Sequence, residues 1–211
     1  MKTNTQNFTL LMALLCITIF AASCTSADIY KKEELNGVLK EKVGEHIDTK
    51  TKVTKMIISC GGNNSVNGKI RSVTIYYNAT DGKRRVAYIP IDILAGSFED
   101  KEDIGSQPDS ELTGEEGRYI KDYDYSAIAT NVQKAAEIAT SKGYPASGVN
   151  TYTITFYNDP ISDRHTFSIL CKEGKGLKMK DKQIVAQYYE FQCEADSKGN
   201  VTIPDMETAG E

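Results

Sequence analysis

The chain has 211 residues, of which 40% are hydrophobic and 26% are charged, and it carries a formal net charge of −4 at pH 7. This composition is typical of a globular protein and excludes general disorder. A modestly acidic balance without any block of basic residues argues against nucleic acid or an anionic lipid surface as the partner.

The first 23 residues have the pattern of an export signal. Lys2 provides a positive charge, and an apolar run of 15 residues follows from Phe8 to Ala22, with Thr9 and Thr18 as its polar members. This run is too short for a transmembrane helix, which needs about 20 apolar residues. We therefore expect residues 1–23 to be a cleaved signal peptide.

Small residues stand directly before Cys24, in the order Ala21, Ala22, Ser23. This arrangement resembles the lipobox of bacterial lipoproteins, although Ala21 stands where leucine is usual, and the resemblance covers only the leader and Cys24. It implies that Cys24 is acylated, as with palmitate, and becomes the first residue of the mature protein. Two or three acyl chains on Cys24 meet the requirement for stable membrane anchoring.

The resemblance implies a protein anchored in the bacterial cell envelope, with the outer membrane as the expected location and the membrane as a partner through the lipid. Residues 24–31 would then form a short tether. The alternative is ordinary secretory cleavage after Ala27, which also follows small residues. That route would give a soluble secreted or periplasmic protein.

Residues 32–96 predict a helix followed by antiparallel strands. Apolar residues recur at helical spacing over 31–47, which predicts an amphipathic helix: Leu35, Val38, Leu39, Val43 and Ile47. Residues 53–60 alternate as a strand, and Asn67-Gly68 predicts a hairpin turn after them. Strands over 71–78 and 84–93 form a second hairpin, and Pro90 predicts an edge or a bulge in the latter.

Residues 97–118 differ sharply in character and are predicted to be an acidic loop or linker. Within residues 97–117, eight acidic residues stand against Lys101 alone: Glu99, Asp100, Glu102, Asp103, Asp109, Glu111, Glu115 and Glu116. Such a segment buries too little apolar area to order itself. Its carboxylates are possible ligands for a hard cation, but the alternating spacing and glycine of a calcium loop are absent.

Residues 119–211 repeat the order of a helix followed by strands. The helix is predicted over 125–142 and ends before Gly143 and Pro145. Strands are predicted over 151–158, 164–172 and 183–195. The fold class is therefore α+β, with two amphipathic helices on an antiparallel sheet, and a duplication of helix-plus-three-strand units is one possibility.

Three thiols remain in the mature chain, at Cys60, Cys171 and Cys193. Each ends an apolar run, so we expect all three to be buried and reduced rather than paired. A cysteine nucleophile would need His46 or His165 as its base, and no local motif supports this. No zinc spacing, phosphate loop or hydrolase motif is present, so the sequence assigns no catalytic, metal or cofactor residue.

Tyrosine is abundant and tryptophan is absent, with 12 tyrosines in the chain. Those on predicted strands are Tyr76, Tyr77, Tyr88, Tyr152, Tyr157, Tyr188 and Tyr189. They fit half-buried sheet positions, and an exposed row of them would serve recognition. We therefore expect a non-catalytic binding or accessory module for a protein or small molecule. The alternatives are an envelope hydrolase that uses carboxylates and a small inhibitor of an envelope enzyme.

Overall fold

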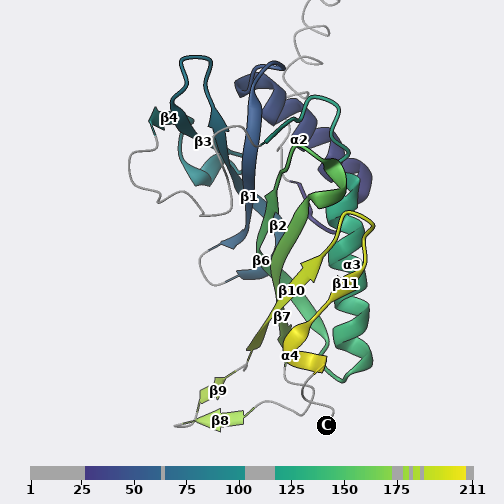
Figure 1. The fold of residues 1–211 in the computed structure, drawn as a ribbon. Coiled ribbons are helices and arrows are strands. Elements are labelled where there is room, and N and C mark those ends of the chain that lie inside the picture. Colours follow the sequence, from purple (N-terminus) through teal and green to yellow (C-terminus); the bar gives the residue numbers. More distant parts are fainter. Residues whose placement is uncertain are drawn as a thin grey trace, which may run out of the picture.

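A computed structural model describes residues 27–62, 65–102, 117–172, 178–180, 183–185 and 188–207 (Figure 1). The helices are α2 (Lys32–His46), α3 (Ser126–Ser141) and α4 (Pro204–Glu207), with 3₁₀ turns η1 (Ile93–Ala95) and η2 (Pro160–Ser162). The strands are β1 (Lys52–Gly62), β2 (Ser65–Asn78), β3 (Arg84–Pro90), β4 (Glu99–Glu102), β5 (Arg118–Tyr119), β6 (Ala146–Thr155), β7 (Arg164–Lys172), β8 (Lys178–Lys180), β9 (Gln183–Val185), β10 (Tyr188–Ala195) and β11 (Val201–Thr202). The predicted α+β class is confirmed.

One antiparallel sheet of nine strands organises the molecule. Its order is β11-β10-β7-β6-β1-β2-β3-β4, and β5 pairs with the start of β1. The strands of residues 32–96 and those of residues 119–211 meet where β1 pairs with β6. Both stretches therefore belong to one sheet. Strands β8 and β9 form a separate two-stranded sheet.

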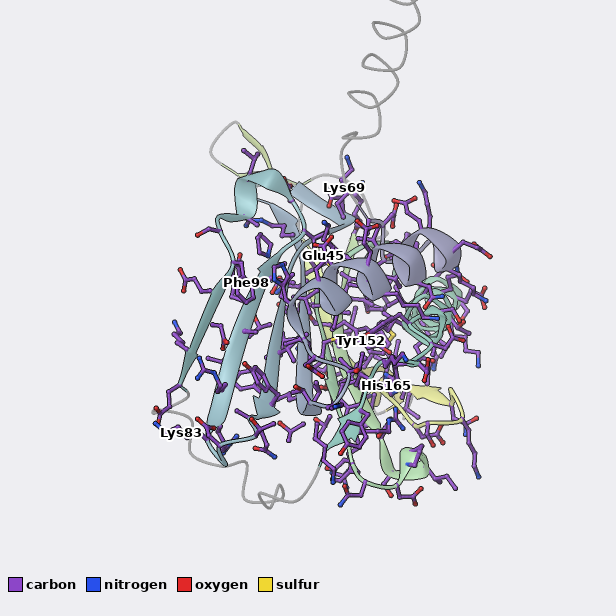
Figure 2. The ribbon with its side chains drawn as sticks, turned by 90° about the horizontal axis from the view of Figure 1, so that it is seen from above. Glu45, Lys69, Lys83, Phe98, Tyr152 and His165 are labelled. Carbon is purple, nitrogen blue, oxygen red and sulfur yellow. The ribbon has the colours of Figure 1, made fainter. Side chains whose placement is uncertain are left out.

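Helices α2 and α3 lie on the same face of the sheet (Figures 1 and 2). Both form where the apolar spacing predicts them, within one residue at each end. Helix α2 buries Leu35, Leu39 and Val43, and α3 buries Ile128, Ala129, Asn131, Val132, Ala135 and Ala139. These side chains join the strands in one hydrophobic core. A fully buried leucine contributes about 1.5–3 kcal/mol relative to an exposed one.

The segment before α2 is docked on the sheet, so the predicted tether is shorter than residues 24–31. Ala27 and Ile29 are fully buried, and Ile29 N–H donates to the Gly68 carbonyl at 2.7 Å. A Cβ on Gly68 would lie 2.5 Å from Tyr30 Cδ2 and 2.6 Å from Asp28 Oδ1. Gly68 therefore lies inside β2, where it makes room for this segment, and the predicted turn at Asn67-Gly68 is wrong. Residues 24–26, the rest of the predicted tether, lie outside the described residues.

The acidic segment predicted as a loop or linker over 97–118 begins with an ordered strand. Strand β4 is exposed along its whole length, yet it pairs with β3 from Arg85 to Tyr88. Lys83 and Arg85 form ion pairs with Glu102 and Asp100 across this pairing. Backbone pairing and these ion pairs order the strand without buried apolar area. Residues 103–116 lie outside the described residues.

The predicted strand over 183–195 is divided between two strands: Gln183–Val185 form β9 in the separate two-stranded sheet, and β10 begins at Tyr188. Cys171 on β7 faces Tyr189, and Cys193 faces Phe167. From the sequence we expect a uniform hairpin of these two strands to place Cys171 opposite about residues 179–184; the observed pairing with Tyr189 shows that this register is wrong. The sequence did not predict β11 or α4. Ile203, between these two elements, and Met206 on α4 are both buried.

No helix within the described residues is long and apolar enough to span a membrane.

Candidate functional site

The sheet face opposite α2 and α3 has no covering helix among the described residues, and we call it the open face (Figure 2). Residues paired across neighbouring strands share a face. On the open face they form one row across seven strands: Tyr88, Thr74, Ile57, Thr153, Thr166, Glu194 and Thr202. A neighbouring row consists of Val86, Tyr76, Lys55, Thr155 and Arg164. All of these side chains are partly or fully exposed.

Hydroxyl groups dominate the centre of this face. Thr151, Thr153 and Thr155 alternate along β6 with Tyr152 and Ile154, which are buried on the opposite side. This alternation can be recognised in the sequence. Only the burial of Tyr152 and Ile154 in the structure shows that the threonines are the accessible side chains. A partly exposed surface of hydroxyls and aromatic rings is suited to recognition.

The strand tyrosines are divided between the two faces rather than gathered in one exposed row. Tyr76 and Tyr88 lie on the open face, and the Tyr88 hydroxyl donates to the Ala95 carbonyl at 2.8 Å. Tyr77 and Tyr152 lie on the helix-covered face. Tyr152 therefore has a structural role in the core, while Tyr76 and Tyr88 remain accessible for recognition.

A cleft of about 580 Å³ lies at one end of the sheet, between η2 and the turn from β10 to β11. It adjoins the open face, since that face contributes Arg164, Thr166, Glu194 and Thr202 to it. Its other lining residues are Ile161, Ser162, Asp163, His165, Ala195, Asp196 and Asn200. This volume falls within the range of about 300–1,000 Å³ that is usual for small-molecule sites.

A chain of buried polar groups leads from α3 to this cleft. Asn131 Nδ2 donates to the Tyr152 hydroxyl at 2.9 Å, and that hydroxyl lies 2.9 Å from His165 Nδ1. Because the hydroxyl accepts from Asn131, its own proton is directed to Nδ1, and the neutral ring then carries its proton on Nε2. Figure 2 places Tyr152 and His165 in the layer between the strands and α3.

A second buried polar group beside the cleft is the carboxylate of Asp163. It forms an ion pair with Arg118 on β5 and accepts from the Tyr157 backbone N–H at 3.1 Å. The Arg118 guanidinium lies 5.3 Å from the ring centre of Tyr123 and 5.4 Å from that of Phe156. Burial raises the pKa of Asp163 despite the hydrogen bond and the cation.

Cys60, Cys171 and Cys193 are free and buried, as predicted. Burial raises the pKa of the Cys60 and Cys193 thiols to about 12 and that of Cys171 to about 11. Thiols with such pKa values carry almost no thiolate at neutral pH, so they are poor nucleophiles. His46 is exposed and stacks on Phe98, with ring centres 4.1 Å apart.

Cys24, the predicted lipidation residue, lies outside the described residues. Among the residues that are described, no group of three or more His, Cys, Asp or Glu side chains is placed to hold a metal ion.

No family model matches the chain, and no curated protein or solved structure matches it significantly.

The burial of His165 predicts a loss of stability at mildly acidic pH. Burial, with a smaller contribution from Arg118, lowers the pKa of His165 to about 4. In the unfolded chain this pKa is about 6.5, so between these two values the unfolded state binds more protons and the free energy of unfolding falls as the pH falls. In urea titrations, we expect wild type to lose about 2 kcal/mol more than His165→Gln between about pH 7 and pH 4.5.

The raised pKa of Asp163 acts in the opposite direction, since a carboxyl that protonates more readily when folded adds stability as the pH falls. Both proteins keep Asp163, so their difference reports on His165. Equal losses in the two proteins would show that His165 is not buried in its neutral form.

Proposed function

We propose that the protein is a lipid-anchored, non-catalytic binding module of the bacterial cell envelope, and that the open face of its sheet holds a protein partner. The observation that carries this proposal is the row of partly exposed side chains from Tyr88 on β3 to Thr202 on β11. The row crosses seven strands, while small ligands usually occupy concave sites. A surface of this breadth is better suited to a macromolecule.

The position of Ala27 supports cleavage before Cys24. Ala27 is fully buried, and its carbonyl accepts a hydrogen bond from Ile70 N–H at 2.8 Å. Cleavage after Ala27 would remove this residue from the core, whereas cleavage before Cys24 leaves it in place. The docked segment from Ala27 onward would then hold the domain close to the membrane surface.

The strand order also supports an architecture of two helix-plus-strand units. Helix α2 precedes the sequential pairing of β1, β2, β3 and β4, and α3 precedes that of β6, β7, β10 and β11. The first strands of these two series, β1 and β6, pair at the centre of the sheet. We infer that the two halves are equivalent units placed edge to edge, which builds an open face wider than either half could offer.

The hydrolase alternative has less support. Carboxylate catalysis in a desolvated site needs two such groups close together. Asp163 is the one buried acidic side chain among the described residues, and it pairs with Arg118 instead of a second carboxylate.

The proposal is tested by placing a photo-crosslinking amino acid at Thr153 on the open face of the full chain in living cells. The matched control position is Thr140, an exposed threonine on α3. We expect an ultraviolet-dependent, protease-sensitive adduct from position 153 and none from position 140. In the same cells, a fatty-acid analogue should label wild type but not Cys24→Ser.

Equal adduct formation at both positions, or none at position 153, would contradict binding through the open face. Processing and membrane retention that persist in Cys24→Ser, without any label in wild type, would contradict the lipid anchor.

A further inference from the structure

The docked segment that starts at Ala27 lies beside the 3₁₀ turn η1. Ile70 N–H donates to the Ala27 carbonyl at 2.8 Å, and Ile91 N–H donates to the Arg71 carbonyl at 2.8 Å. Ile70 and Arg71 are consecutive residues of β2, and a bulge in the β1–β2 pairing at this point turns both groups to the edge that β1 leaves free. Ala27 and Ile91 are therefore neighbours on that edge.

The direction of the docked segment brings its start toward η1. Asp28 pairs with Lys69 in an antiparallel bridge, so the N-terminal side of Ala27 faces Ile91. Residues Ile93–Ala95 of η1 follow shortly after Ile91. We call the surface formed by Asp28, Lys69 and Leu94 the η1 surface.

Leu94 is the apolar group of this surface, and its side chain is 82% exposed. The Asp92 carboxylate accepts from Leu94 N–H at 3.0 Å, and the Ala95 carbonyl accepts from the Tyr88 hydroxyl at 2.8 Å. These bonds hold the turn, so the exposure of Leu94 is a fixed feature of the fold. A single exposed leucine is common on proteins and by itself indicates nothing. The position of Leu94 beside Ala27 is what gives it a consequence.

The docking of Ala27 limits the distance between the η1 surface and a lipid anchor at Cys24. Ala27 follows Cys24 by three residues. Three fully extended residues span at most about 10–11 Å. The headgroup layer of a bilayer is itself about 5–8 Å deep. An acylated Cys24 therefore keeps Ala27, and η1 beside it, at the level of the headgroups or just above them.

The polar groups of the η1 surface are compatible with this position. Lys69 is exposed at the margin of the molecule (Figure 2). The Asp28 carboxylate accepts from Tyr30 N–H at 3.0 Å, so part of its hydrogen-bonding capacity is used within the protein. One cation and one anion give this surface little net charge. Contact with a membrane therefore does not require anionic lipid.

We propose that the η1 surface lies against the membrane and that the Leu94 side chain contacts lipid at the boundary between headgroups and acyl chains. This inference rests on the lipid anchor of the proposed function and adds the orientation of the domain to it. One leucine is too small to hold a domain on a bilayer, so the short link to Cys24 must bring it there.

The absence of tryptophan from the chain allows a direct test, because a single introduced tryptophan reports on its own position. Leu94→Trp is made in the full chain, and the acylated protein is purified from membranes and incorporated into phosphatidylcholine vesicles with or without brominated acyl chains. Thr80→Trp is the matched control, since Thr80 is exposed in the turn after β2. Asn78, at that end of β2, lies roughly 25 Å along the strand from Ile70.

Bromine quenches tryptophan fluorescence only at short range. We expect brominated lipid to quench Leu94→Trp at least about threefold more strongly than Thr80→Trp, because an interfacial side chain reaches the acyl boundary. An insertion of about ten Gly and Ser residues between Ser26 and Ala27 adds a flexible spacer of roughly 15–20 Å. It should lower the quenching of Leu94→Trp severalfold, while the protein still floats with the vesicles.

Equal quenching at positions 94 and 80, or no quenching at position 94 in protein that floats with the vesicles, overturns this orientation and leaves the lipid anchor in place. Quenching that the insertion does not change also contradicts the proposal, because the short link would then not position the surface. Protein that carries no acyl chain and does not float with the vesicles overturns the anchor and the orientation together.

Discussion

Arg118→Ala is expected to lower the free energy of unfolding by about 3–5 kcal/mol, which is the range for breaking a buried ion pair by removing one partner. The Asp163 side chain is only 4% exposed, so the substitution would leave a buried carboxylate without its cation. The guanidinium also covers the rings of Tyr123 and Phe156, and this contact is lost with it.

The pKa of Asp163 is raised because burial disfavours the ionised carboxylate more strongly than the hydrogen bond from Tyr157 and the Arg118 cation favour it. The Arg118–Asp163 pair therefore contributes little net stability, although removing either partner leaves the other charge buried without compensation. We expect Arg118→Ala with Asp163→Asn to be less destabilised than the sum of the two single variants.

Urea titration at neutral pH measures these differences, and Lys121→Ala at a nearby exposed position is the control, with an expected change within about 0.5 kcal/mol. If Arg118→Ala unfolds at the same urea concentration as this control, Asp163 does not depend on Arg118.

Tyr152→Phe is expected to cost about 2–4 kcal/mol, although it removes only one oxygen atom. The hydroxyl is the shared partner of Asn131 Nδ2 and His165 Nδ1, so its loss leaves a buried donor and a buried acceptor unpaired. Each unpaired buried group costs about 1–3 kcal/mol. The ring itself remains packed, since Phe167 stacks on it with ring centres 4.8 Å apart.

Tyr119→Phe provides the matched control, because Tyr119 is 54% exposed and should tolerate the change within about 0.5 kcal/mol. A second readout comes from the His165 ring, whose nitrogen chemical shifts should change in Tyr152→Phe as Nδ1 loses its donor. A small loss of stability together with unchanged His165 shifts would show that the polar chain is not formed.

Local patterns in the sequence were sufficient to predict both long helices and most strands. The spacing of Leu35, Leu39 and Val43 places these residues on one side of a helix. The alternation from Thr151 to Thr155 likewise places the threonines on one side of a strand. The burial of Cys60, Cys171 and Cys193 followed from their places at the ends of apolar strands. The segment over 97–118 was predicted less well, because β4 is ordered by partners far away in sequence.

The candidate sites depend on pairings that no local pattern contains. Alternation along β6 separates its threonines from Tyr152 and Ile154, but only the pairing of β6 with β1 and the common side of α2 and α3 decide which set is covered. Likewise, Asn131, Tyr152 and His165 come from a helix and two strands, and they meet because α3 lies across β6 and β7. Local periodicity thus determined the elements and their apolar sides. Long-range strand pairing decided which side remained open and brought the polar groups to the cleft, because both depend on contacts between residues distant along the chain.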